Sequence, residues 1–563
     1  MQRIGGPFFR PQFQDSQVFQ LANNLTWQKG SHAMKFGVEF RRDNLNYIDL
    51  RSLNGELSFT DGRYTGFGFG DFLLGLASAQ RLTLFHEPDL YANGWQFYAQ
   101  DSWRARPNLT ITAGIRYEMF TPLLDRNNLL TNIDPATGRT FTAKDGSIFD
   151  RALIHPDRDD IAPRVGVTWS ASDRLVIRGG YGIFYQQFDR YGSESQLGLN
   201  LPQLVDASIS ANSGTDVPAF TFTQGFTPLN PTTVNPAIVQ WRIQDPEQDT
   251  PVVQQFSFGP EFQFTDNMVA AVEYVGNRTR NGRRLRNLNE GVINGSTVVF
   301  PYAQYGYGNA YLEQIVTNGR ADYDALQMRM QRRMSGGLSY TVAYTWGKAL
   351  GDFLDHLSAG GGAVGNNPSS TYAMEKDYGL LAFDIKHRLV TSFIYELPFG
   401  PGRAFEPGGA LGAIARDWSV NGILTLSGGR PFTVTTTDQA QTGPGRLARA
   451  NCVGGAVPDG FDQTLDSWMD PAAFATTTVR TYGNCANNTV RGPGSKSMNL
   501  SVFRSFRLGA ERRAEFRVET FNLFNWVNYG FPASNISNLG TFGRITSSIG
   551  DQREVQLAVK FYF

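Results

Sequence analysis

The sequence predicts an all-β protein, a large antiparallel β-barrel that crosses a membrane. Two observations carry this prediction. Segments of alternating apolar and polar residues recur along the chain, and short turns between them alternate with long polar stretches. Successive strand side chains point to opposite faces of a sheet, so this alternation marks strands with one apolar face. The expected number is about 17 strands, or about 18 with one more at the N-terminus.

The clearest strand is the last one, at residues 553–563. Its length matches the roughly 9–11 residues that a tilted strand needs to cross a bilayer. The apolar face carries Val555, Leu557, Val559, Phe561 and Phe563. Similar patterns place the other expected strands at residues 16–28, 32–48, 54–60, 79–86, 92–103, 108–120, 160–170, 174–187, 251–264, 266–278, 321–334, 338–350, 385–397, 415–428, 497–507 and 512–524.

The connections indicate which ends of the strands face the cell. Tight turns of Gly, Asp, Ser and Pro join many strand pairs, whereas six connections are long and polar. The long stretches are 121–159, 188–250, 279–320, 351–384, 429–496 and 525–552. Outer-membrane barrels have short periplasmic turns and long extracellular loops. Residues 61–78 are then expected to form a longer periplasmic connection with a short helical turn.

Counting back from the last strand, the first strand runs towards the periplasm and lacks an upward partner. A barrel of this kind normally has an even number of strands. We therefore expect residues 1–15 to be an N-terminal remnant and residues 16–563 to be one barrel domain that lacks its first strands. The alternative is that residues 4–14 form an eighteenth strand.

Composition excludes several classes of protein. Lysine plus arginine and aspartate plus glutamate are both 51, so a nucleic-acid partner is not expected. No run of 18 apolar residues would make a transmembrane helix. The N-terminus lacks the apolar segment of a signal peptide. The five histidines are scattered, and no catalytic triad, metal-ligand spacing or phosphate loop is visible, so neither an enzyme nor a cofactor is expected.

A few residues are candidates for particular roles. Cys452 and Cys485 lie in one polar stretch and predict a disulfide in an oxidising compartment, the alternative being two unrelated thiols. Trp241, Trp468 and Trp526 lie in expected outer loops, as possible ligand contacts or, preferably, packing anchors. The five arginines of residues 278–286 predict a solvated rim, or a site for lipopolysaccharide phosphates. Lumen charges such as Arg116 and Glu118 are expected to pair across strands.

Several segments, in order, resemble the barrel of TonB-dependent outer-membrane receptors, especially the Oar-like branch. They include FYAQDSW at 97–103, LTITAGIRYE at 109–118, YTWGK at 344–348, RGPG at 491–494 and ETFNLFN at 519–525. The resemblance implies a barrel of roughly 22 strands with a plugged lumen. The plug domain and the TonB box of that family have no counterpart in this sequence. Phe561 and Phe563 resemble the terminal signal read by the barrel-assembly machinery.

The resemblance implies an integral protein of the Gram-negative outer membrane that takes up a scarce solute such as a siderophore, an oligosaccharide or a peptide. Its expected partners are outer-membrane lipid and lipopolysaccharide, the barrel-assembly machinery, and the TonB complex through the missing N-terminal region. Two alternatives are a soluble extracellular β-rich binding or adhesion protein and a passive porin. The position of the apolar faces separates the soluble alternative from the others, because a soluble sheet buries them.

Overall fold

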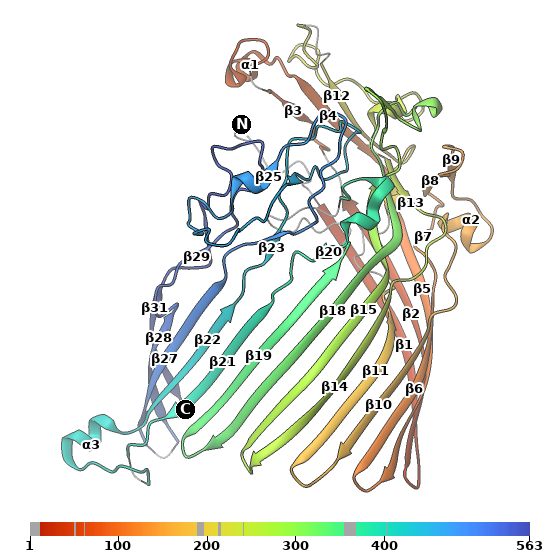
Figure 1. Cartoon of the computed structure of the whole chain (residues 1–563). Helices are drawn as coiled ribbons and strands as arrows, with labels where there is room; N and C mark the ends of the chain where they lie inside the picture. Colours follow the sequence, from red (N-terminus) through yellow and green to blue (C-terminus); the bar gives the residue numbers. More distant parts are fainter. Residues whose placement is uncertain are drawn as a thin grey trace.

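The computed structural model describes residues 12–49, 52–60, 62–187, 196–211, 216–239, 241–353, 367–400, 402–509 and 511–563. Its main feature is one 18-stranded sheet that is tall, tilted and curved (Figure 1). Three of the 18 strands are short segments, β7 (Leu124–Asp125), β13 (Trp241–Gln244) and β20 (Gly379–Leu380). The other fifteen are long enough to cross or nearly cross a bilayer.

The long strands follow one another across the sheet in chain order, and each is antiparallel to the next. They are β1 (Gln12–Lys29), β2 (His32–Asp49), β5 (Asp89–Arg106), β6 (Leu109–Phe120), β10 (Ile161–Ser170), β11 (Leu175–Tyr185), β14 (Val252–Thr265), β15 (Met268–Asn287), β18 (Leu312–Ser335), β19 (Leu338–Gly351), β21 (His387–Glu396), β22 (Trp418–Ser427), β27 (Ser495–Arg507), β28 (Arg513–Phe521) and β31 (Glu554–Tyr562).

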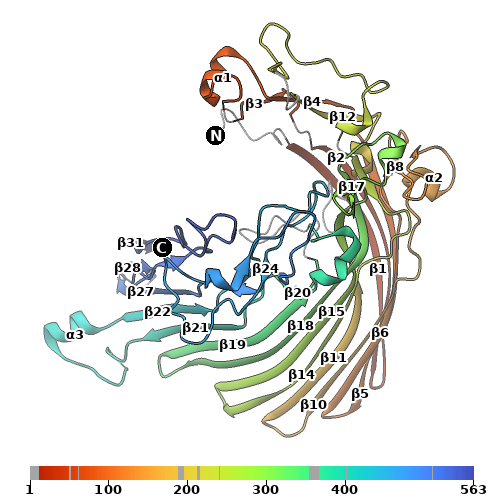
Figure 2. The same cartoon turned by 45° about the horizontal axis from the view of Figure 1, so that its top comes forward.

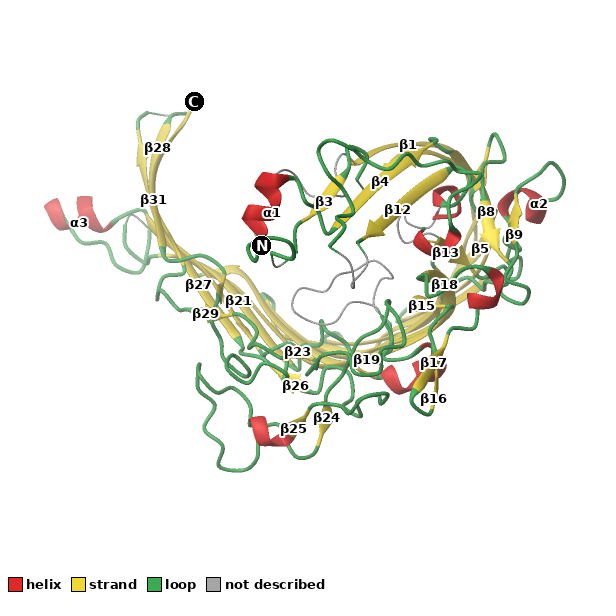
Figure 3. Ribbon diagram, turned by 90° about the horizontal axis from the view of Figure 1, so that it is seen from above, coloured by secondary structure: helices red, strands yellow, loops and turns green. Residues whose placement is uncertain are grey.

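The sheet is open between its first and last strands. Within the described residues, β1 pairs only with β2 and β31 only with β28. Seen from above, β28 and β31 lie far from β1, and the sheet forms a curved trough (Figure 3). The expectation that further strands complete a barrel of roughly 22 stays a prediction.

One face of the sheet is apolar from edge to edge, and we call it the apolar face. Directly opposed residues of an antiparallel pair share a face, so the register extends this assignment from strand to strand. Its side chains are exposed, as Val38 (40%), Ile115 (52%), Phe258 (61%) and Leu557 (67%) show. A soluble sheet would cover such a face with protein. The expectation of an apolar belt open to lipid is therefore confirmed, and the soluble alternative is wrong.

Tryptophan and tyrosine side chains lie on the apolar face near both ends of the strands. Trp27, Trp103 and Trp169 are near the short turns, whereas Trp95 and Trp346 are near the long loops. Valine, isoleucine, leucine and methionine lie between these levels. Aromatic girdles at the two interfaces flank the apolar band of transmembrane barrels, so the sheet has the surface of a membrane-spanning one.

The connections alternate between the two rims as expected. Tight turns form the lower rim in Figure 1, for example at Gly336 and Gly337 between β18 and β19. Their φ angles of 59° and 82° suit a two-residue hairpin turn that only glycine adopts readily at both positions. The one long lower connection, between β21 and β22, holds helix α3 (Gly409–Ala415). Within the described ranges no helix is both long and apolar enough to cross a bilayer.

Two expected transmembrane strands are wrong. Residues 56–58 and 79–85 form β3 (Glu56–Ser58) and β4 (Ala79–Phe85) of a separate three-stranded sheet with β12 (Leu204–Ser210). This sheet and helix α1 (Gly68–Leu74) lie at the loop rim (Figure 2), so residues 61–78 are not a periplasmic connection. These alternating runs are too short to cross a bilayer. Because two expected strands drop out of the transmembrane count together, the first strand still runs towards the periplasm.

The N-terminal boundary also differs. Strand β1 begins at Gln12 rather than at residue 16 and pairs with β2 along its whole length. Residues 12–15 therefore belong to the sheet rather than to a remnant, and residues 12–14 extend the first strand rather than form an eighteenth one. Residues 1–11 lie outside the described part of the chain.

Strands β15 and β18 are longer than expected. The stretch 279–320 reads as a polar loop, yet β15 continues to Asn287 and pairs with β18 from Glu313 onwards. The parts of these strands that extend beyond the lipid carry charged residues. The alternation of apolar residues that marks a strand in the sequence therefore ends earlier than the strand itself.

The long connections are packed at the loop rim. Most of the remaining elements lie there: β8 (Thr131–Ile133), β9 (Thr140–Thr142), α2 (Ile148–Ala152), η1 (Gln196–Leu199), η2 (Pro236–Ile238), β16 (Val292–Asn294), β17 (Thr297–Val299), η3 (Ala303–Tyr305), η4 (Thr371–Asp377), β23 (Pro431–Phe432), β24 (Asn451–Cys452), η5 (Pro471–Ala473), β25 (Phe474–Ala475), β26 (Val490–Arg491), β29 (Asn528–Tyr529) and β30 (Ser548–Ile549). Small buried clusters form between connections. One contains Leu45, Leu90, Leu130, Leu153 and Leu204, and another contains Phe432, Met469 and Phe474.

Candidate functional site

The face of the sheet opposite the apolar face carries paired charges. On β6, Arg116 Nε lies 2.5 Å from Glu118 Oε1, and on β28 Arg517 pairs with Glu515 and lies 4.0 Å from Glu519. These pairs join residues two apart on one strand, so the expected pairing across neighbouring strands is wrong for Arg116 and Arg517. It does occur between Arg178 on β11 and Glu261 on β14, which lie 3.3 Å apart. Arg517 lies directly opposite Ala558 on β31 and Phe503 on β27, so neither neighbouring strand places an acidic residue directly opposite it.

The basic stretch at residues 278–286 forms ion pairs through Arg278, Arg280 and Arg284, whereas Arg286 donates to the Gln314 side chain. Arg278 Nη2 lies 2.8 Å from Asp324, and Arg280 Nη1 lies 2.8 Å from Asp322 on the neighbouring strand. Arg284, further up β15, has a side chain only 3% exposed. The interpretation as a solvated rim is therefore wrong for Arg284, and the acidic partners offset the charge expected to attract phosphates.

Arg284 belongs to a buried ionic cluster at the foot of the loops. Its guanidinium lies 3.4 Å from Asp352 and 3.2 Å from Asp377, and Arg449 lies 3.3 Å from the other oxygen of Asp377. All four side chains are at most 4% exposed. Burial raises the pKa of Asp377, while the charges of Arg449 and Arg284 oppose that rise. The cluster joins β15, the end of β19, η4 and the connection after β22.

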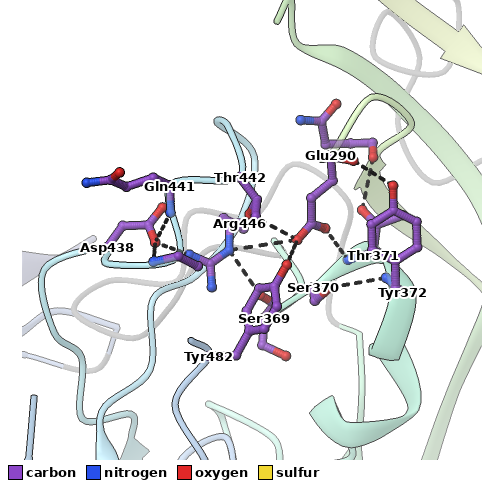
Figure 4. A network of polar contacts seen from close by, with 12 residues as sticks. Glu290, Ser369, Ser370, Thr371, Tyr372, Asp438, Gln441, Thr442, Arg446 and Tyr482 are labelled. Atoms are coloured by element: carbon purple, nitrogen blue, oxygen red, sulfur yellow. Dashed lines mark hydrogen bonds and ion pairs between the residues drawn. The ribbon is translucent and has the colours of Figure 1, made fainter. Parts of the chain in front are cut away.

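A second buried network surrounds Glu290, which lies between β15 and β16 (Figure 4). Its carboxylate accepts hydrogen bonds from the Tyr482 hydroxyl at 2.9 Å, from the Thr442 hydroxyl at 3.2 Å and from the backbone N–H of Thr371. Arg446 Nε lies 4.0 Å away, and Arg446 also pairs with Asp438. Burial, with the Glu290 charge second, raises the pKa of Tyr372 to about 12.

These two networks connect three long loops, 288–311, 352–386 and 428–494. A buried charge that lost its partner would be costly, so each network favours one arrangement of the loops. Sequence reasoning missed Glu290 and Asp377. Nothing in their local sequence marks them, because their charged partners and the partners of Glu290 are about 70 to 190 residues away along the chain.

The three candidate tryptophans have different surroundings. Trp241 is 2% exposed, packs against Tyr307 and donates its indole N–H to the Pro236 carbonyl at 3.1 Å. Trp468 is half-buried and donates to the Arg491 carbonyl at 2.7 Å. Both have the contacts of packing anchors, and the burial of Trp241 leaves little of its surface for a ligand to contact.

Trp526 is more exposed than Trp241. It is half-buried, and the centroids of the Trp526 and Phe524 rings are 4.7 Å apart. The Lys496 ammonium lies 5.2 Å from the centroid of the Trp526 ring. The contacts of the three tryptophans involve different residues, and none of these contacts joins one tryptophan to another.

The two cysteines are joined. Cys452 and Cys485 form a disulfide within the connection between β22 and β27. Cys485 is 1% exposed and belongs to the apolar cluster around Phe432 and Met469. The bond therefore ties β24 to the core of this loop.

The end of the chain is exposed. Phe561 lies on the apolar face of β31 and is 58% exposed, and Phe563 is 94% exposed just beyond the strand. Packing within the described part of the chain therefore does not explain an aromatic residue at this position, and its reading by the assembly machinery stays a prediction.

An acidic group that sequence reasoning also missed lies directly before β10. One oxygen from each of Asp157, Asp159 and Asp160 lies within 4.8 Å of the others. Asp160 is 1% exposed, and burial raises its pKa to about 6, with Gln187 opposing and Asp157 reinforcing the rise. The sequence signal was the run DRDD at 157–160. Asp384, in the connection before β21, pairs with Arg491, whereas His387, the first residue of β21, contacts the Tyr344 hydroxyl.

The chain is similar to solved outer-membrane proteins over nearly its whole length. The outer membrane transporter YddB from Escherichia coli has 10% identity and a TM-score of 0.49, with 98% of this chain and 54% of that chain covered. The ferric-catecholate import receptor Fiu from Escherichia coli K12 has 12% identity and a TM-score of 0.43, with 98% and 55% covered. The ferric preacinetobactin receptor BauA from Acinetobacter baumannii has 10% identity and a TM-score of 0.44, with the same coverage. The chain thus spans about half the length of these proteins.

Boletus edulis lectin is 29% identical over 122 residues, which are 21% of this chain and 82% of the lectin. That stretch is too small a part of the chain to assign its fold. The model of a family described as outer membrane beta barrel domain, in contrast, matches residues 1–556. This match agrees with the exposed apolar face, the aromatic girdles and the alternation of short turns with long loops. The chain belongs to the outer membrane beta barrel domain family and is an integral protein of the outer membrane.

Proposed function

We propose that this chain is the barrel part of a TonB-dependent receptor that takes up a scarce solute through the outer membrane. The observation that carries the proposal is the loop rim. Three long loops are held to one another by buried ion pairs around Glu290 and Asp377, above the end of a polar sheet face. Passage of a solute alone does not require ordered loops of this size, whereas capture of a dilute solute benefits from a preorganised surface.

In this proposal each part of the chain has a separate task. The polar face of the sheet, with its paired charges on β6 and β28, forms the wall of the path. The loop rim binds the solute, and a plug domain, gated by energy from the inner membrane, would control passage. The chain itself performs no chemistry on the solute. The solute belongs to one of three classes: siderophores, oligosaccharides or peptides.

The test is uptake by cells that carry the gene in its natural context. Labelled ferric siderophores, oligosaccharides and peptides are offered to wild-type cells, to a deletion strain and to the complemented deletion strain. We expect the deletion to abolish uptake of one class and a proton uncoupler to abolish the same uptake in wild-type cells. Uptake that survives the uncoupler, together with a steady open conductance of the protein in planar bilayers, would replace the proposal by a passive porin.

A further inference from the structure

We propose that Asp157, Asp159 and Asp160 bind a divalent cation of the calcium class at the loop rim. The three carboxylates come from four consecutive residues that lead into β10, and one oxygen of each lies within 4.8 Å of the others. Three negative charges this close repel one another strongly, and a bound cation removes that repulsion. Acidic residues often cluster on surfaces without an ion, so the inference depends on a second observation.

That observation is the state of Asp160. Its side chain is buried, with the residue 1% exposed, and Oδ2 accepts a hydrogen bond from Gln187 Nε2 at 2.9 Å. Oδ1 is also buried and has no hydrogen-bond partner among the residues that the structure describes. A buried carboxylate oxygen without a partner is rare, because its desolvation is not repaid. A cation shared with Asp157 and Asp159 would supply the missing interaction.

The neighbouring groups hold the site in place. Asp157 accepts the backbone N–H of Thr250 at 2.7 Å and that of Asp159 at 3.3 Å, which fixes the turn. Asp249 and Glu118 add negative charge nearby. The positively charged side chain of Arg283, on the same side of the site, donates to the Gln187 carbonyl at 3.1 Å.

The donor set selects the kind of metal. Its atoms are all carboxylate oxygens, which suit hard cations, and His155 nearby is engaged with Glu247 and the Phe149 ring. Asp157 and Thr250 also line a cavity of about 80 Å³ with room for water. Calcium takes roughly six to eight oxygen ligands in flexible geometry, so three carboxylates and several waters form a reasonable shell.

A cation here would link two extracellular connections. Asp157–Asp160 end the loop between β6 and β10, whereas Gln187 and Thr250 begin and end the loop between β11 and β14. Binding would therefore order both loops at the point where they leave the sheet. This role does not depend on which solute the protein takes up.

The test uses the whole chain, purified in detergent and stripped of metal with a chelator. Calcium chloride is titrated calorimetrically into the native chain and into D159N, D160N and D462N. Asp159 is exposed, so D159N keeps the fold intact, whereas D160N removes the charge of the buried group. Asp462 is an exposed aspartate of another loop and serves as the control.

We expect one calcium ion to bind per native and D462N chain, and binding to weaken by about tenfold or more in D159N and in D160N. Calcium should also slow proteolytic cleavage of the loop at residues 121–160 in the native chain and not in D159N. Absence of calcium binding by the native chain, or equal affinity of D159N and D160N with the native chain, would overturn the site.

Discussion

The Arg284 guanidinium lies 3.2 Å from the Asp377 carboxylate, and the two side chains are 3% and 2% exposed. Arg284 belongs to a strand of the sheet, and Asp377 to the loop between β19 and β21. The carboxylate also accepts the backbone N–H of Ser369 and faces Arg449. This one aspartate therefore joins the sheet to two loops. Its removal leaves Arg449 buried without its carboxylate partner and leaves Arg284 with Asp352 alone.

We expect Asp377→Ala to destabilise the loop rim by about 3–5 kcal/mol, the usual cost of leaving a buried charge unpaired. The measurement is the denaturant dependence of proteolytic cleavage within residues 428–494, for the protein in lipid vesicles. Asp466→Ala is the matched control, because Asp466 is 85% exposed and pairs with Arg544 at the surface. Its effect should be small, since exposed ion pairs contribute little. Equal protection of D377A and D466A would show that the buried pairs do not hold the loops.

Removing the disulfide should loosen a different part of the rim. Cys452 and Cys485 are 33 residues apart, and closing a loop of that size is worth roughly 3–4 kcal/mol in the chain-entropy model. We expect the double substitution of both cysteines by serine to increase cleavage within residues 428–494 while the strands stay protected. Treatment of the native protein with a reductant should reproduce the effect, and the reductant should not alter the double variant further.

The position of the apolar face can be tested by placing a charge on either side of one strand. Val342 lies on the apolar face of β19 opposite Met330 and Thr391, and Thr341 lies on the other face opposite Gln331 and Ser392. We expect Val342→Arg to lower the stability of the folded protein in bilayers by about 2–4 kcal/mol, because an arginine then meets hydrocarbon. Thr341→Arg should have a much smaller effect.

The measurement for this pair is equilibrium unfolding by guanidinium in phospholipid vesicles, followed by tryptophan fluorescence. Both variants carry the same new side chain in adjacent positions, so strand propensity cancels. An equal loss of stability in the two variants would mean that the apolar face does not face lipid.

The sequence predicted the membrane-crossing part of the fold well because contact with lipid requires an apolar residue at every second position of a strand. A strand such as β31 must show an apolar residue at every second position, and that pattern is local. The prediction failed where the demand stops. Strand β15 continues to Asn287 with charged side chains, and β4 alternates over seven residues without crossing the bilayer.

The loop networks were out of reach for a different reason. Glu290 is 1% exposed, and its partners Thr371, Thr442 and Tyr482 come from two other loops. Their pairing is fixed by tertiary packing, which a single sequence does not display. The cysteines could be proposed as partners because only two are present, whereas Asp377 is one of many aspartates.

Substitution of the last residue, Phe563, is expected to affect assembly into the outer membrane but hardly the stability of the folded protein. Phe563 is 94% exposed, so Phe563→Ala removes almost no buried surface, and the free energy of unfolding should change by less than about 0.5 kcal/mol. If the terminal aromatic is read during insertion, the same variant should still reach the outer membrane less efficiently than the native chain.

The free energy of unfolding is measured on refolded protein in vesicles. The efficiency of assembly is measured as the amount of heat-modifiable protein in outer-membrane fractions. Leu508→Ala, at an exposed residue of the turn between β27 and β28, controls for the loss of an exposed apolar side chain. Native amounts of F563A in the outer membrane would contradict the expectation that the assembly machinery reads the terminal aromatic residue.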